Sequence, residues 1–499
     1  MTIKDLFSFK SERIKVLHFT WFAFFVSFFA WFSMAPLATT MMENMDWLTA
    51  EHLAALGICN VVLTIPARII IGQLLDKWGP RIVFSGLLIT MSLPTIIFAF
   101  GDTWIQLMIS RLVLGSIGAS FVIGIRMVAE WFPPKHVGFA EGIYGGWGNF
   151  GSAAAAILLP WLALTVFAGD NGYRYALAFT GVVCFLYGIL YYFVVRDTPK
   201  GKKLVRPKRT AALEVSSWGD LIQLMIWTLP LGGAVAISAW RLEGLGFISK
   251  PILYVVYTVI LIVLFYQLYT ILKINIPILR KGVPKEDRYK FRNVVALNST
   301  YFANFGAELA IVSMLPMFFQ LTFSLSAAQA GLIASSFAFV NLLARPLGGV
   351  LSDRLGSRRK VMLVYMIGIS IGLLLMGFIN SSWPLAFAVA ITIITSMFIQ
   401  GAEGATFAVI PLIKKRITGQ IAGMSGAYGN VGSTVYLTLY TFVSAQQFFF
   451  LLATGAIISF IICYFMLDEP KNSFAENYYL TEEELVEANQ IVAPVRKSM

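Results

Sequence analysis

The chain of 499 residues is strongly apolar, since hydrophobic residues make up 58% of it and charged residues only 13%. Its mean hydropathy is +0.75. This composition excludes an ordinary soluble domain and is typical of a protein that crosses a membrane many times. The formal net charge of +12 does not indicate nucleic-acid binding, because the basic residues gather in the connections between apolar segments.

Fourteen apolar segments are long enough to span a bilayer, for which about 18 residues suffice. In chain order, the predicted spans are 17–38, 52–75, 82–101, 104–128, 138–167, 174–195, 219–240, 251–274, 294–321, 327–351, 361–380, 384–412, 420–441 and 446–467. Lysine and arginine are dense in the N-terminal tail and in the connections after the sixth and before the ninth span, whereas Glu43, Asp46 and Asp102 mark connections of opposite parity. This bias places both termini in the cytoplasm. The predicted fold is an all-α polytopic membrane protein.

Two stretches of the chain share a pattern that indicates an internal repeat. In each, an arginine (Arg68 or Arg345) comes four residues before a glycine and eight before an aspartate (Asp76 or Asp353). If the aspartates mark the cytoplasmic ends of their spans, each arginine lies about 12 Å inside an apolar layer whose half-thickness is about 15 Å. A guanidinium keeps its proton, so at this depth it needs a water-filled cavity or an anionic partner. The alternative is snorkelling to the headgroups, but the repeated pair favours a central cavity that holds an anion.

Two glycine-rich runs, 142–152 and 423–433, match each other, and each contains one asparagine, Asn149 or Asn430. The repeat therefore divides the chain into two six-helix bundles, and parallel repeats of this kind place a substrate between them near the midplane. The predicted domains are an N-terminal bundle at 1–200, a linker with two inserted spans at 201–292, a C-terminal bundle at 293–470 and a cytoplasmic tail at 471–499.

The two apolar segments of the linker are predicted to form a peripheral pair of spanning helices outside the transport core. Pro230, Arg241 and Glu243 interrupt the first segment, so a single re-entrant or interfacial segment is the alternative. In the tail, the run from Thr481 to Glu484 has the pattern of a capping box and indicates a short acidic helix.

The pattern Gly-x-x-x-Asp-[Lys/Arg]-x-Gly-x-Arg follows each deep arginine. It resembles the signature of the major facilitator superfamily between its second and third helices, and it recurs in the second half. Its aspartate can pair with basic neighbours and with helix ends across the loop. The residues expected to act in gating, and not in substrate binding, are Asp76, Arg81, Asp353 and Arg358.

Two guanidiniums and two side-chain amides form a donor-only set, which suits a small planar monoanion rich in oxygen acceptors. The runs Gly-Gly-Trp-Gly-Asn149-Phe-Gly and Gly-Ala-Tyr-Gly-Asn430-Val-Gly resemble the paired nitrate signatures of the nitrate/nitrite porter family, within the major facilitator superfamily. The two deep arginines match the substrate-binding pair of that family. Segments 304–310 and 402–411 resemble the branch found in cyanobacteria, algae, fungi and plants.

The resemblance implies that nitrate lies between Arg68 and Arg345 and is sandwiched by aromatic rings. Tyr301 and Phe305, four residues apart on one helix face, match two of the aromatic positions, and Phe121 matches a third. A flat delocalised anion can stack on a ring when flanking arginines offset the repulsive quadrupole. The alternative is that these rings only pack in the core or face lipid, since the chain has 41 phenylalanines.

Proton coupling needs a group other than the arginines, which cannot release a proton. The candidates are two carboxyls at depth, Glu308 and Glu403. Apolar surroundings favour the neutral form of a carboxyl, which can then bind and release protons near neutral pH. The alternative is a structural role, in which these residues neutralise an arginine.

The predicted function is import of nitrate and nitrite by alternating access in a multi-pass protein of the cell inner (plasma) membrane, coupled to protons. The alternatives are exchange of nitrate for nitrite and transport of another small anion by the same fold. The sequence shows no metal cluster, nucleophile–base pair or nucleotide-binding loop, so we expect no enzyme activity, no cofactor and no metal. The expected partners are the anions, protons and membrane lipid, without nucleic acid, and the expected state is a monomer.

Overall fold

The computed structural model describes residues 3–205, 207, 211–325, 327–440 and 442–476, and the expected helix near Thr481 lies outside them. The described chain is all-helical and contains no strand. The helices of the first part are α1 (Glu12–Trp31), α2 (Ala38–Asn44), α3 (Ala50–Val62), α4 (Thr64–Trp78), α5 (Pro80–Ala99), α6 (Trp104–Leu114), α7 (Ser120–Trp131), α8 (Pro134–Trp161) and α9 (Gly172–Val194). The middle part holds α10 (Trp218–Ile226), α11 (Leu229–Gly244) and α12 (Lys250–Lys281). The last part holds α13 (Phe291–Phe323), α14 (Ala327–Phe339), α15 (Asn341–Arg354), α16 (Arg358–Gly377), α17 (Leu385–Ile413), α18 (Thr418–Tyr440) and α19 (Ala445–Met466).

The predicted fold is confirmed. Within the described residues, thirteen helical segments are long and apolar enough to cross a membrane. Helix α18, 23 residues long and rich in glycine, packs between α4 and α13 and makes the fourteenth. The division into domains at residues 200 and 293 stays a prediction.

Several predicted spans are broken helices. The span predicted at 104–128 consists of α6 and α7, joined by a short 3-10 turn at Gly115–Ala119. A Cβ atom on Gly118 would lie 2.5 Å from the ring of Trp31, so only glycine lets α1 and this turn approach each other so closely. Periodicity in sequence does not reveal such a break, because both helices are apolar.

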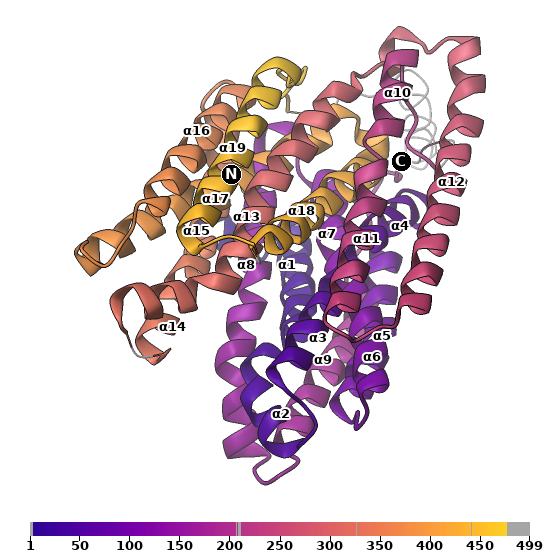
Figure 1. Ribbon diagram of the computed structural model, residues 1–499. Helices are drawn as coiled ribbons and strands as arrows, with labels where there is room; N and C mark the ends of the chain where they lie inside the picture. Colours follow the sequence, from indigo (N-terminus) through magenta and orange to yellow (C-terminus); the bar gives the residue numbers. More distant parts are fainter. Residues whose placement is uncertain (1–2, 206, 208–210, 326, 441, 477–499) are drawn as a thin grey trace.

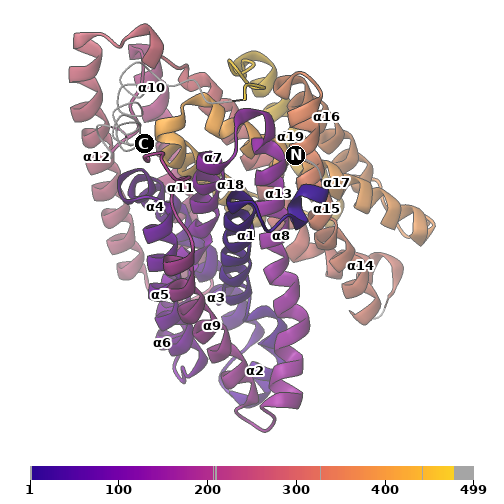
Figure 2. The ribbon, with the colours of Figure 1, turned by 180° about the vertical axis from the view of Figure 1, so that it is seen from behind.

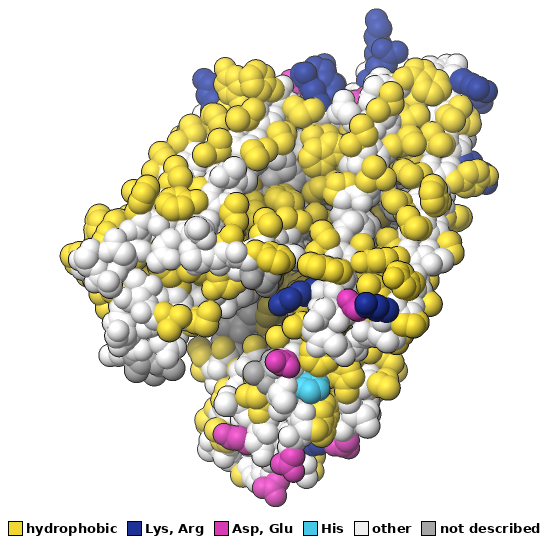
Figure 3. All heavy atoms as spheres, in the orientation of Figure 1, with side chains coloured by type: hydrophobic (Ala, Val, Ile, Leu, Met, Phe, Trp, Pro, Cys, Tyr) yellow, Lys and Arg dark blue, Asp and Glu magenta, His cyan; other side chains and the backbone are white. Residues whose placement is uncertain are grey.

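Charge is distributed along the long axis of the molecule. On the face shown in the space-filling view, Lys and Arg side chains gather at the upper end, and several Asp and Glu side chains are visible at the lower end (Figure 3). The upper end is therefore the cytoplasmic side. At the opposite end, α14 of the last part and α2 of the first part lie apart in both ribbon views (Figures 1 and 2).

The most extensive contacts between the first and last parts are made by two helix pairs, α8 with α15 and α4 with α18. A Cβ atom on Gly349 of α15 would overlap the carbonyl oxygen of Gly138 on α8. A Cβ atom on Gly72 of α4 would lie 2.5 Å from the carbonyl oxygen of Gly419 on α18. The same glycine contact thus occurs twice, and it brings backbone against backbone.

The inserted helices lie at one edge of the molecule (Figure 1). Helix α11 packs on α3, α4 and α18, so it touches both the first and the last part of the chain. The hydroxyl of Tyr428 on α18 donates a 2.6 Å hydrogen bond to the carbonyl oxygen of Trp227, just before α11. Helix α12 exposes a long apolar face that includes Val255, Ile262 and Phe265, as expected for a helix against lipid.

The glycine contact between α8 and α15 predicts that Gly349→Ala destabilises the protein. The added methyl group has no room beside the Gly138 carbonyl, and overpacking of this kind costs roughly 1–3 kcal/mol. We expect a lower Tm in detergent, measured by scanning fluorimetry. Gly233→Ala is the matched control, because nothing lies within 4 Å of a Cβ atom there. Equal Tm values for the two variants would contradict the assigned packing.

Candidate functional site

The two deep arginines are buried and reach across the boundary between the first and last parts of the chain. Arg68 is 0% and Arg345 2% exposed. Arg68, on α4, donates from Nη1 to the carbonyl oxygen of Gly426 on α18. Arg345, on α15, donates from Nη1 to the carbonyl oxygen of Gly145 on α8 at 3.5 Å. Gly145 and Gly426 are equivalent positions of the repeated glycine runs, so each arginine binds the glycine run of the opposite part.

The same two rings lie beside both arginines. The Cζ atom of Arg68 lies 5.7 Å from the ring centre of Phe121 and 5.3 Å from that of Phe305. For Arg345 the corresponding distances are 5.8 and 6.0 Å. The ring of Tyr301 is nearly parallel to both, at 6.0 Å from Phe121 and 5.0 Å from Phe305. The structure thus brings all three predicted aromatic residues together with the arginine pair.

The predicted asparagines are buried on the helices that carry the glycine runs. Asn149 lies four residues after Gly145, and Asn430 lies four residues after Gly426, so each asparagine shares a helix face with its glycine. The side-chain oxygen of Asn149 and both polar side-chain atoms of Asn430 have no hydrogen-bond partner within the described residues. Buried amides are normally satisfied, so these groups are open to a polar ligand.

The two carboxyls proposed for coupling both lie against Arg345. Its Nη2 atom is 3.1 Å from an oxygen of Glu308, and the same nitrogen pairs with Glu403. Asn341 holds the other oxygen of Glu308 through a 2.8 Å hydrogen bond. Among the described residues, no carboxylate lies within ion-pair distance of Arg68. The two arginines therefore occupy equivalent positions of the repeat, but only Arg345 has carboxylate partners among the described residues.

The two aspartates expected to act in gating each accept backbone hydrogen bonds near the start of a helix across the same boundary. Asp353 accepts hydrogen bonds from the backbone N–H groups of Gly138 and Phe139, at 3.0 and 2.7 Å, in the first turns of α8. Asp76 accepts them from Gly419 and Gln420, at 3.2 and 3.1 Å, in the first turn of α18. An anion at a helix N-terminus is favourable, because the free N–H groups and the helix dipole point at it. We call these two caps the cytoplasmic seal.

The basic partners of the two caps differ. Arg358 pairs with Asp353 at 2.9 Å and donates to the carbonyl oxygen of Pro134 at 2.6 Å. Arg81 does not reach Asp76, because its guanidinium stacks over the ring of Tyr192 at 4.8 Å. The cation that faces Asp76 is instead Arg126 of α7, at 3.9 Å.

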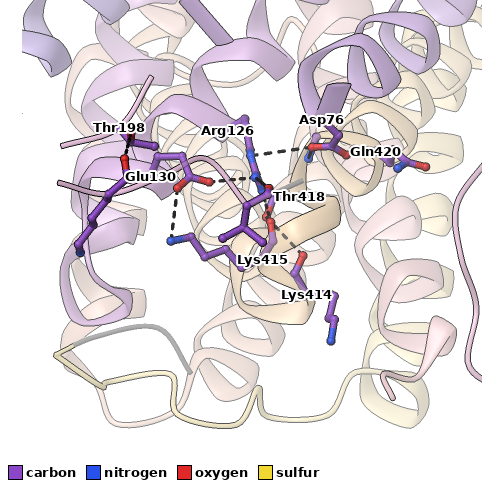
Figure 4. Close-up of polar contacts among 11 residues, drawn as sticks. Asp76, Arg126, Glu130, Thr198, Lys414, Lys415, Thr418 and Gln420 are labelled. Carbon is purple, nitrogen blue, oxygen red and sulfur yellow. Dashed lines mark hydrogen bonds and ion pairs between the residues drawn. The ribbon is translucent and has the colours of Figure 1, made fainter. Parts of the chain in front are cut away.

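Arg126 is the centre of a polar cluster beside the seal (Figure 4). It pairs with Glu130 at 2.9 Å and donates to the carbonyl oxygens of Val205 in the linker and Lys415 before α18. The ammonium group of Lys415 lies 3.4 Å from Glu130. Burial lowers the pKa of Lys415, and Glu130 opposes that shift. The cluster ties the first part, the linker and the last part together at the cytoplasmic side.

Comparison with known proteins agrees with this geometry. The sequence profile described as Major Facilitator Superfamily matches residues 20–283 and 297–493. "Nitrate/nitrite transporter NrtP" of Picosynechococcus sp. is 46% identical, with 95% of this chain and 96% of that protein covered. The protein of the same name from Nostoc punctiforme is 45% identical with the same coverage. The chain belongs to the nitrate/nitrite porter family of the major facilitator superfamily. The solved structure of the human organic anion transporter MFSD10 shares the fold, with a TM-score of 0.61 at 13% identity over 91% of this chain and all of that one (100%).

Sequence reasoning missed several residues of this porter's site. Phe407 of α17 packs edge-on against Phe121 and Tyr301, at 4.5 and 4.7 Å between ring centres. Asn341 and the pair of Arg126 and Glu130 were also missed. The i, i+4 spacing of Arg126 and Glu130 near the end of a span was the available signal, whereas no pattern in sequence distinguishes Phe407 from other core rings.

The cap on α18 predicts that Asp76→Asn loosens the cytoplasmic seal. An amide offers one acceptor oxygen and no charge, so the closed state should lose about 1.5–3 kcal/mol of stability. The population of open molecules should then rise at least about tenfold. A cysteine introduced at Met424, which is buried on α18, should then react faster with a maleimide added from the cytoplasmic side. The three native cysteines are buried. Asp46→Asn, at an exposed site of the other side, is the control, and equal labelling rates in both variants would refute the cap.

Proposed function

We propose that this porter imports nitrate and nitrite across the plasma membrane by alternating access, together with protons. The observation that carries the proposal is the pair of buried guanidiniums beside the same two aromatic rings. The relatives named as nitrate/nitrite transporters support the choice of anion. Nitrate and nitrite are small planar oxyanions, and a guanidinium fork can donate to two of their oxygens at once.

The arrangement favours a monoanion over a larger or more highly charged substrate. Arg68 has no carboxylate partner among the described residues, so its guanidinium is open to contact with a substrate anion. The unpartnered side-chain NH2 group of Asn430 adds a donor without adding charge. A bulkier dianion would ask for more hydrogen-bonding partners than two amides supply. Uptake competition by formate and cyanate tests the choice among small anions.

Charge balance in the buried site supports proton coupling. Arg68 and Arg345 carry two positive charges, and Glu308 and Glu403 carry two negative charges when ionised. Entry of one nitrate adds a negative charge, which is costly at low dielectric. Protonation of one carboxyl restores the balance and frees Arg345 to bind the anion. In this mechanism, nitrate and at least one proton move through the site together.

Alternating access then requires the cytoplasmic seal to open. Asp76 and Asp353 hold the seal closed by capping α18 and α8 across the boundary. Separation of the pairs α4–α18 and α8–α15 would pull each arginine away from the glycine carbonyl of the opposite part. The anion loses one of its two guanidiniums in that step and is released to the cytoplasm.

Exchange of nitrate for nitrite is the second candidate, and one observation favours it. Both carboxyls are already held by Arg345, which suits permanent counter-ions as well as titrating groups. In an exchanger, the returning anion takes the place of the proton in keeping the charge of the site constant.

Replacement of either arginine by lysine should abolish high-affinity binding. Lysine keeps the charge but lacks the fork that grips two oxygens, so we expect at least about tenfold weaker uptake for Arg68→Lys and for Arg345→Lys. The measurement is uptake of labelled nitrate into proteoliposomes. Arg196→Lys, at an exposed position, is the control. An unaltered affinity for nitrate in both site variants would contradict the proposed site.

Replacement of the carboxyls separates symport from exchange. With an inward proton gradient, Glu308→Gln and Glu403→Gln should each lose gradient-driven accumulation of nitrate, because glutamine cannot release a proton. Nitrite-loaded vesicles measure exchange in the same variants. Glu12→Gln, which alters an exposed carboxyl, is the control. Gradient-driven uptake that survives in both site variants would exclude these residues as the coupling groups.

A further inference from the structure

A third carboxyl, Glu141, is buried in the path between the substrate site and the cytoplasmic seal. It lies on α8 and is 2% exposed. Within the part of the chain that the structure describes, neither of its oxygens has a hydrogen-bond partner. It forms no ion pair with another described residue, unlike the buried carboxyls Glu308 and Glu403. A buried carboxylate without a partner is very unfavourable, so the geometry requires the neutral, protonated form.

Its place along α8 is defined on both sides. Gly138, three residues earlier, donates its N–H to Asp353 of the seal. Gly145, four residues later, accepts from Arg345 of the substrate site. At the rise of an α-helix, these positions are about 4.5 Å and about 6 Å from Glu141 along the axis. Glu141 is therefore interposed between the anion site and the cytoplasmic exit.

The internal repeat shows that packing does not require a carboxyl here. The equivalent of Gly142 is Gly423, so the equivalent of Glu141 on α18 is Ala422, which is also buried. The contact of α18 with α4 thus forms with a residue that cannot ionise at the position equivalent to Glu141. The carboxyl is therefore present in the α8 copy of the repeat and absent from the α18 copy.

Asp353 of α15 is the charged group that acts electrostatically on Glu141, and the sign is repulsive when both are ionised. Other charged or titratable groups on Glu141's own helix and on the helices packed against it include Tyr144 on α8, Arg345 on α15, Glu403 on α17, Arg126 and Glu130 on α7, and His18 on α1. Each of these has a partner elsewhere: Tyr144 with the backbone carbonyls of Ser120 and Phe121 on α7, Arg345 with Glu403, Arg126 with Glu130, and His18 with the carbonyl oxygen of Leu6. Among the described residues, no cation lies within ion-pair distance of Glu141.

We propose that Glu141 is a proton-binding site that must be occupied for the cytoplasmic seal to close. When α8 and α15 separate, water reaches the carboxyl and its proton leaves to the cytoplasm. The resulting carboxylate opposes reclosure until a proton returns to the same oxygen. The closed state thus binds this proton more tightly than the open state, so the closed population falls as the pH rises. The inference rests on the proposed alternating access but not on the identity of the anion.

The test is a pH titration of the conformation in the full-length protein, in nanodiscs and without nitrate. Spin labels on cysteines introduced at Lys77 of the first part and Leu355 of the last part, both exposed, report the opening of the cytoplasmic side. For the wild type, the ratio of open to closed molecules should rise by up to about tenfold per pH unit. In Glu141→Gln this dependence should be lost, with the seal closed throughout. Glu12→Gln should behave as the wild type.

Glu141→Ala gives a second variant, because alanine occupies the equivalent buried position of the repeat. It should also lose the pH dependence. The proposal is overturned if either variant titrates like the wild type, or if the wild type does not respond to pH. Since no nitrate is present, failure of nitrate uptake by the wild type would contradict the proposed function and leave this test intact. Loss of the pH response together with normal nitrate uptake at acidic pH would support both.

Discussion

A permanent positive charge inside the membrane is the constraint on which the rest of this structure depends. Arg68 and Arg345 cannot become neutral, and the chain compensates them in different ways. Arg345 has two carboxylates, whereas Arg68 has backbone carbonyl oxygens of Gly118 and Gly426 and the faces of aromatic rings. Backbone dipoles and rings lower the cost of a buried cation without cancelling its charge. In the proposed site, Arg68 is therefore the arginine that is free of a carboxylate partner among the described residues.

The internal repeat places the same set of contacts on two helix pairs between the first and last parts of the chain. In each copy, one helix supplies an arginine and an aspartate eight residues apart. The opposite part supplies a helix whose glycine run receives the arginine and whose earlier turn receives the aspartate. The backbones touch where Gly349 meets Gly138 and where Gly72 meets Gly419. Substrate contact and seal therefore lie on the same two helix pairs. In the proposed mechanism, a movement that breaks one breaks the other, which would couple release of the anion to opening.

The sequence predicted the spans, the repeat and the arginine pair, because each depends on a pattern along the chain: hydropathy, matched motifs and charge at a known depth. It did not predict which carboxylate meets which arginine. Glu403 and Arg345 are 58 residues apart, and only the packing of α15 on α17 brings them together. The role given to Arg81 in gating is likewise not supported by contact with Asp76, since Arg126 of a distant helix takes that place. Long-range pairings of this kind leave no local signal.

The symmetric and asymmetric features of the molecule serve different purposes. Glycine contacts, caps and arginines occur in both copies, and a rocking motion about an approximate twofold axis needs such equivalence. The carboxyls, in contrast, do not occur in both copies. Glu308 and Glu403 pair with Arg345, and the repeat equivalent of Glu141 is Ala422. Glu308 and Glu403 contact Arg345 of α15, and Glu141 lies on α8, the helix that packs against α15. In the proposed cycle, protons therefore act on one of the two helix pairs, and the other pair would follow if each part moves as one body.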